Sequence, residues 1–116
     1  MMVEYREYAI RMGKMPAFIQ EYKSKGLPVQ LKHLRTPVGF FTAETGEAPR
    51  FVHLWAFESL RDREEQRATL HDDPEWQAYV LVSHEYIVDM RVRFLNVLDF
   101  GSCCLLSPTV HKRPDV

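Results

Sequence analysis

The sequence predicts a small α+β domain whose strands and helices follow one another in the order βαββαβ. Three observations lead to this prediction. The chain has 116 residues, which suits one domain and is too short for two full ones. Segments in which apolar and polar residues alternate, as in strands, are separated by segments with the apolar spacing of helices. Proline, glycine and helix-capping residues lie between these segments.

A strand and a helical region make up the first third of the chain. Residues 3–12 alternate loosely and are rich in tyrosine, which is typical of a strand. Residues 15–22 carry apolar side chains at the i, i+3, i+4, i+7 spacing of an amphipathic helix. Gly26 is a common helix stop, so we expect a break at residues 25–27 and a short second helix that ends near Arg35.

The next two predicted strands are residues 38–44 and 50–57, with a turn at residues 45–49. So short a connection favours an antiparallel hairpin. Neighbouring side chains of a strand point to opposite faces of the sheet, and both faces of the second strand are largely apolar. One face carries Phe51, His53, Trp55 and Phe57, and the other carries Val52, Leu54 and Ala56.

Two helix-start signals and a long strand follow. Ser59, with Asp62 three residues later, resembles a capping box and predicts a helix over residues 60–71. The Asp-Pro pair at residues 73–74 predicts the start of another helix. Residues 86–98 alternate again and predict a last strand with one wet face.

This order of elements is that of a ferredoxin-like fold, in which a four-stranded antiparallel sheet carries its helices on one face. We expect residues 1–98 to form this domain and residues 99–116 to form an irregular tail. The second face of the sheet is also apolar and would stay exposed in a monomer. The simplest cover is a second copy of the sheet, packed face to face about a two-fold axis. The alternative is that the tail folds back over this face.

The composition excludes several classes of protein. The formal net charge is −1, from 15 Lys and Arg against 16 Asp and Glu, so no overall field attracts nucleic acid or an anionic membrane. No apolar run approaches the roughly 18 residues of a membrane span, and a cytoplasmic location is expected. The only cysteines, Cys103 and Cys104, are adjacent and are expected to be free thiols. Neither metal-ligand spacing nor a cofactor motif is present, so no metal and no cofactor is expected.

His53 is the first candidate for chemistry. It lies in the middle of a strand between Phe51 and Trp55, on a face that we expect to be buried. A buried histidine could act as a general base, because its pKa is easily moved across neutral pH. The commoner alternative is a core histidine whose ring nitrogens are satisfied by hydrogen bonds.

A guanidinium and a phenol share one face of the first strand. If the face that carries Arg6 and Tyr8 lies under the helices, the pair suits a carboxylate, enolate or phosphate oxygen. The alternative is an ion pair of Arg6 with Glu4 on the strand surface. Arg63 and Arg67, one helical turn apart, could add positive charge to the same pocket, although charged helix faces are more often solvated.

Aromatic side chains supply possible walls for such a pocket. Tyr22 and Trp55 are our candidates for contact with a ligand, since small-molecule sites combine apolar walls with a few polar groups. The alternative is that helix-face aromatics, including Trp76 and Tyr79, simply fill the core.

Several segments of the chain resemble one protein family in collinear order. They are EYREY at residues 4–8, GLPVQ at 26–30, VGFF at 38–41, VHLW at 52–55, SLRDRE at 59–64 and DPEW at 73–76. Over residues 3–98 the sequence resembles the NIPSNAP family. The resemblance implies a dimeric α/β barrel, in which two ferredoxin-like sheets pair. It implies no reaction, because the family has no agreed catalytic activity, and fold alone does not transfer one.

Two functions follow from these candidates. The first is a cofactor-independent small enzyme that acts on a small acidic or aromatic metabolite, with His53 as the base and with Arg6 and Tyr8 holding an oxyanion. The second is a non-catalytic homodimer that serves as a binding or scaffold protein. A cleft near His53 would favour the first, and a filled core would favour the second.

Overall fold

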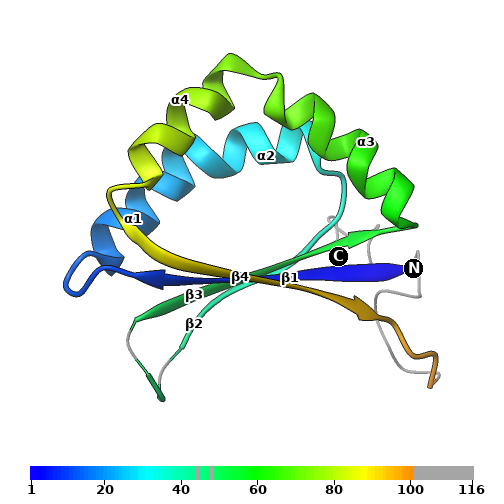
Figure 1. Cartoon of the computed structure of the whole chain (residues 1–116), viewed down its shortest axis with the longest axis horizontal. Coiled ribbons are helices and arrows are strands. Elements are labelled where there is room, and N and C mark those ends of the chain that lie inside the picture. Colours follow the sequence, from blue (N-terminus) through cyan, green and yellow to red (C-terminus); the bar gives the residue numbers. More distant parts are fainter. Residues whose placement is uncertain (44, 48, 101–116) are drawn as a thin grey trace, which may run out of the picture.

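The computed structural model describes residues 1–43, 45–47 and 49–100. It confirms the predicted α+β architecture: a four-stranded sheet carries the helices on one face, in two layers (Figure 1). The strands lie in the order β2-β3-β1-β4, and every neighbouring pair is antiparallel. Nearly all of the expected tail, together with Cys103 and Cys104, lies outside the described residues.

The sheet register decides which side chains meet. Strand β1 (Met2–Ile10) lies between β3 (Arg50–Phe57) and β4 (Ile87–Asn96), and β2 (Pro37–Thr42) pairs with the outer edge of β3. The β1–β3 ladder sets Arg6 opposite His53. Directly opposed residues share a face of an antiparallel sheet, so the register brings the polar face of β1 against the aromatic face of β3.

The first helical region is continuous, and the predicted break at residues 25–27 is wrong. Helix α1 (Met15–Glu21) passes through a π-helical turn, η1 (Tyr22–Gly26), into α2 (Leu27–His33). Gly26 keeps a helical backbone conformation. A Cβ at this position would lie 2.7 Å from a ring carbon of Tyr79. The glycine therefore serves the close approach of another helix and does not end its own.

The second helical region begins at the predicted caps. Helix α3 (Leu60–His71) starts after Ser59, whose hydroxyl accepts a hydrogen bond from the backbone N–H of Asp62 at 3.1 Å. Helix α4 (Pro74–Ser83) starts after Asp73, whose carboxylate accepts one from the N–H of Glu75 at 2.9 Å. Each cap satisfies a backbone donor that the helix leaves free. None of the described helices is long and apolar enough to cross a membrane.

His33 connects α2 with the two helices that follow in the sequence, α3 and α4, through its ring nitrogens. The Nδ1 and Nε2 atoms of His33, at the end of α2, lie 3.1 Å from the hydroxyl of Thr69 and 2.8 Å from the carboxylate of Asp73. These contacts join α2 to the junction of α3 and α4. The helix layer is thereby held together independently of the sheet.

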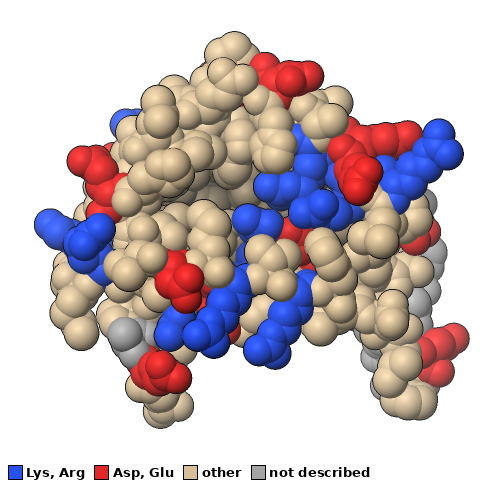
Figure 2. All heavy atoms as spheres, in the orientation of Figure 1, with Lys and Arg blue, Asp and Glu red and all other residues tan. Residues whose placement is uncertain are grey.

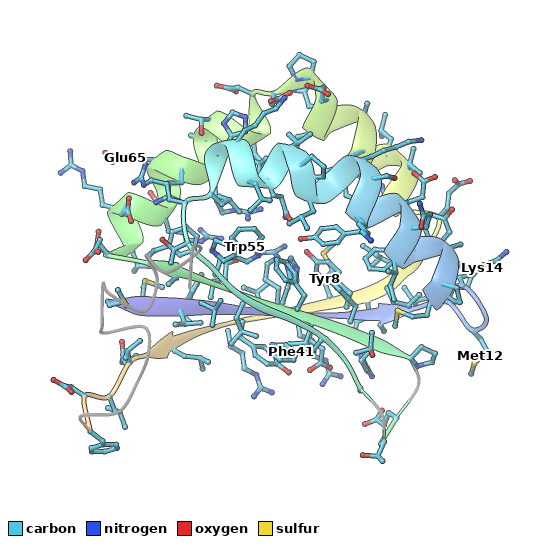
Figure 3. The ribbon with its side chains drawn as sticks, turned by 180° about the vertical axis from the view of Figure 1, so that it is seen from behind. Tyr8, Met12, Lys14, Phe41, Trp55 and Glu65 are labelled. Atoms are coloured by element: carbon cyan, nitrogen blue, oxygen red, sulfur yellow. The ribbon has the colours of Figure 1, made fainter. Side chains whose placement is uncertain are left out.

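The two faces of the sheet differ as the alternation of β3 predicts. Figure 3 shows Tyr8 and Trp55 on the helix side of the sheet and Phe41 on the opposite side. The helix side holds the aromatic core, in which Trp55 is 1% exposed. On the opposite side Phe41 is 55% exposed, and Val52 and Leu54 are only partly buried. The described residues thus leave this sheet face without a helical cover. It is apolar on β2 and β3, whereas β1 and β4 place the charged side chains of Glu7, Arg91 and Arg93 on it.

Strand β4 differs from the expectation that one of its faces is buried and the other exposed to solvent. Its apolar side chains on the helix side, such as Met90 and Phe94, are 44% and 50% exposed. Strand β4 lies at the edge of the sheet. The alternation is present, but an edge position leaves these side chains less covered than those of the central strands.

Candidate functional site

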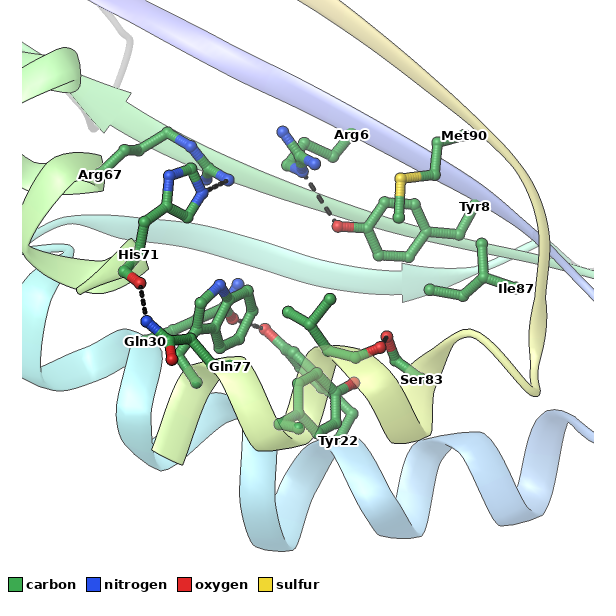
Figure 4. A pocket seen from close by; sticks show the side chains of 13 residues that line it. Arg6, Tyr8, Tyr22, Gln30, Arg67, His71, Gln77, Ser83, Ile87 and Met90 are labelled. Atoms are coloured by element: carbon green, nitrogen blue, oxygen red, sulfur yellow. Dashed lines mark hydrogen bonds between the residues drawn. The ribbon is translucent and has the colours of Figure 1, made fainter. Parts of the chain in front are cut away.

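A cavity of about 400 Å³ lies between the sheet and the helix layer. Its walls come from β1, the π-helical turn, α2, α3, α4 and the start of β4 (Figure 4). Its polar lining includes Arg6, Tyr8, Gln30, Arg67, His71 and Ser83. Its apolar lining includes Trp76, Val80, Ile87 and Met90. In the space-filling view, cationic side chains gather between α3 and the sheet, beside a hollow under α4 (Figure 2).

A buried carboxylate organises two of the arginines. Glu4 of β1 is 1% exposed, and its Oε2 accepts a hydrogen bond of 2.6 Å from Arg6. Its Oε1 accepts one of 2.9 Å from Nε of Arg63 on α3. Burial alone would raise the pKa of this carboxyl, but the hydrogen bond from Arg63 and the charge of Arg6 hold it below its ordinary value. Glu4 is therefore ionised at neutral pH.

A third arginine, Arg67, lies near Arg6 and Arg63. Among the described residues, no carboxylate lies within ion-pair distance of Arg67, and its nearest polar contact is Nε2 of His71, at 3.4 Å. Burial and the nearby charge of Arg6 lower the pKa of Arg67. Three guanidinium groups thus share the single charge of Glu4. An anion in the cavity would relieve this excess of positive charge.

Tyr8 adds a neutral donor at the same end of the cavity. Its hydroxyl oxygen accepts a hydrogen bond of 3.0 Å from Nε of Arg6 (Figure 4). Within the described part of the chain, its own proton has no acceptor. Arg67 and Tyr8 both line the cavity, with Arg6 between them (Figure 4), and N–H and O–H donors of this kind suit an oxyanion.

The helix side of the cavity carries a different polar pair. The hydroxyl of Tyr22 donates a hydrogen bond to Oε1 of Gln30. Burial raises the pKa of Tyr22 above its ordinary value, so the phenol keeps its proton. This end of the cavity is neutral, in contrast to the arginine end.

The structure brings only part of the predicted site together. Arg6, Tyr8 and Tyr22 line the cavity, and Arg63 lies next to it through Glu4. His53 and Trp55 do not line it.

His53 is packed behind the tyrosines. It is fully buried, its ring centroid is 5.0 Å from that of Tyr8, and its Nδ1 accepts a hydrogen bond of 2.8 Å from Trp55. Burial, and then the charge of Arg6, lowers the pKa of His53 to about 3. A neutral ring away from the cavity does not fit a base that contacts a ligand there. The ring is not fully satisfied either, because its buried Nε2 has no hydrogen-bond partner among the described residues.

Some of the polar lining residues have a weak signal in the sequence or none. The charges around Arg67 favour a solvated helix face, but the same face carries buried Leu70 one turn later. Gln30 had a usable signal, since it follows Val29 on the buried side of α2. His71 had none, because it is the exposed last residue of α3. No cluster of three or more metal-ligating side chains occurs among the described residues.

Solved structures with this fold include close relatives. A NIPSNAP family protein of unknown function from Agrobacterium tumefaciens is 34% identical, with 87% of this chain and 91% of that chain covered and a TM-score of 0.83. An uncharacterized NIPSNAP domain protein from Burkholderia xenovorans is 32% identical, with 89% and 100% covered and a TM-score of 0.84.

More distant structures share the fold alone. A protein from Nitrosomonas europaea, with a proposed assignment as an antibiotic biosynthesis monooxygenase, is 12% identical, with 84% of this chain and 99% of that chain covered and a TM-score of 0.60.

Comparison with curated proteins finds no match. The sequence model of the NIPSNAP family matches residues 3–101. The chain therefore belongs to the NIPSNAP family.

Proposed function

We propose that this protein binds a small organic anion with an apolar body in the cavity between the sheet and the helices. The observation that carries the proposal is the set of three arginines around one carboxylate, with Arg67 left without a carboxylate partner in the described residues. The apolar wall formed by Trp76, Val80, Ile87 and Met90 suits the body of the ligand. The volume of about 400 Å³ is within the range of small-molecule sites.

If the protein turns its ligand over, Tyr8 is the best-placed group for proton transfer. Tyr8 lines the cavity, and its hydroxyl oxygen accepts a hydrogen bond from Nε of Arg6, which fixes its position. His53 does not line the cavity, because it is enclosed in the core, and its Nδ1 already accepts a hydrogen bond from the indole N–H of Trp55. Binding without turnover, the alternative function, would use the same contacts.

The proposal predicts that the charge of a ligand decides its affinity. Benzoate carries a carboxylate on a flat apolar ring, and benzyl alcohol has a similar size without the charge. Isothermal titration calorimetry should show saturable binding of benzoate and at least about tenfold weaker binding of benzyl alcohol, because hydrogen bonds to a charged group contribute about 1.5–3 kcal/mol. Equal affinities, or no binding of either probe, would contradict the proposal.

We propose further that the uncovered sheet face pairs with the same face of a second copy. On β2 and β3 this face carries Phe41, Val52 and Leu54, and an exposed apolar patch of this kind often marks a contact surface between copies. Native mass spectrometry should therefore find a dimer. Leu54→Glu should give a monomer, and Leu81→Glu, on the 71% exposed surface of α4, should leave the dimer intact. A wild-type monomer would rule this pairing out.

A further inference from the structure

Gln30 is a buried amide whose hydrogen bonding is incomplete. The residue is 2% exposed and lines the cavity from α2. Its Oε1 accepts the hydrogen bond from the hydroxyl of Tyr22, whose phenol stays protonated. This contact orients the amide, so the remaining group is the Nε2 donor. Within the described residues, that nitrogen has no acceptor.

The helix geometry holds Gln30 in place. The π-helical turn at Tyr22–Gly26 brings Tyr22 to the buried side of the helix, where it reaches the side chain of Gln30. Tyr79 of α4 packs on Gly26, so the turn is fixed by its neighbour as well. Such turns recur at functional sites. The amide is consequently part of a rigid wall, and its donor cannot easily turn to another acceptor.

The cavity therefore has two chemically different ends. Figure 4 shows Arg6 and Arg67 at one side of the cavity, and Gln30 with Tyr22 at the other. The first end presents charged donors and the second a neutral amide donor. A ligand oxygen without charge would complete the hydrogen bonding of the amide, because buried polar groups are normally paired.

We infer that Gln30 is a specificity-determining residue that recognises a neutral hydroxyl or carbonyl oxygen on the apolar body of the ligand. The ligand class is then a flat carboxylate with a second, uncharged oxygen, such as a hydroxy-substituted aromatic acid. This inference rests on the proposed function, because it requires the anionic group to lie at the arginine end.

The test compares benzoate with its three monohydroxylated isomers. Calorimetry on the wild type should find that at least one hydroxybenzoate binds about tenfold more tightly than benzoate, in line with the loss expected when a buried donor stays unpaired. Gln30→Leu should reduce this ratio of affinities to near one. Gln20→Leu, an exposed position on α1, is the matched control and should keep the ratio.

A double variant tests whether a loss of folding, rather than the loss of the amide, changes the binding. Gln30→Leu leaves the hydroxyl of Tyr22 without its acceptor, whereas Tyr22→Phe combined with Gln30→Leu removes both partners and is expected to fold. The double variant should also show a ratio near one. A preference that survives in it, or benzoate binding with no preference for any isomer, would overturn the role of Gln30 and leave the proposed function standing. No binding of any of the four carboxylates would overturn both.

Discussion

Replacing Arg67 by methionine is expected to weaken carboxylate binding by about tenfold or more while the protein remains folded. Arg67 lines the cavity and has no carboxylate partner among the described residues, so its charge is available to a ligand. A charge-assisted hydrogen bond contributes about 1.5–3 kcal/mol, and about 1.4 kcal/mol corresponds to a tenfold change in affinity. Benzoate titration of the wild type and of Arg67→Met measures the difference.

The same substitution should not cost stability. Arg67 is partly desolvated and lies near the charges of Arg6 and Arg63, and its pKa is lowered for these reasons. Methionine has a similar reach and carries no charge, so the free energy of unfolding should stay the same or rise by up to about 1 kcal/mol. Arg61→Met is the matched control, since Arg61 is 90% exposed on the same helix. A loss of stability with unchanged benzoate affinity would identify Arg67 as a structural residue.

The fold could be predicted because its signals are local. The Ser59 cap and the Asp73 cap, which mark the starts of α3 and α4, are each set by residues within three positions of the helix start. The alternation in residues 50–57 likewise depends on the backbone of a single strand. The error at Gly26 has the opposite cause. Its close contact is with Tyr79, far along the chain, and no local pattern reveals such a neighbour.

The candidate site was less predictable because it depends on which face of each element is buried. The period of β1 sets Glu4, Arg6 and Tyr8 on one face, but the sequence does not decide whether that face lies under the helices. The structure realises both alternatives at once: Arg6 pairs with Glu4 and also lines the cavity. Gln30 shows the same limit, since its role depends on a tyrosine eight residues away across a π-helical turn.

Acidification should remove several kcal/mol of stability through His53 alone. Its pKa is lowered to about 3 in the folded protein, from 6.5 for an ordinary histidine, because burial and the charge of Arg6 disfavour the imidazolium. Between these two values the unfolded chain binds one more proton than the folded chain. The stability is therefore fully present above about pH 6.5 and falls by about 1.4 kcal/mol per pH unit as the pH is lowered toward 3.

Urea unfolding of the wild type and of His53→Gln between pH 7 and pH 4 isolates this effect. Glutamine keeps a side-chain acceptor for the indole N–H of Trp55, which donates to His53 at 2.8 Å, but it does not titrate. Glu4 also loses its charge in acid, yet it does so in both proteins, so the difference between the two curves belongs to His53. The wild type should lose stability more steeply, and His84→Gln, at an exposed position, should follow the wild type. Parallel curves for the wild type and His53→Gln would mean that the folded protein protonates this ring as readily as the unfolded chain does. A ring that titrates near neutral pH would restore His53 as a candidate for chemistry.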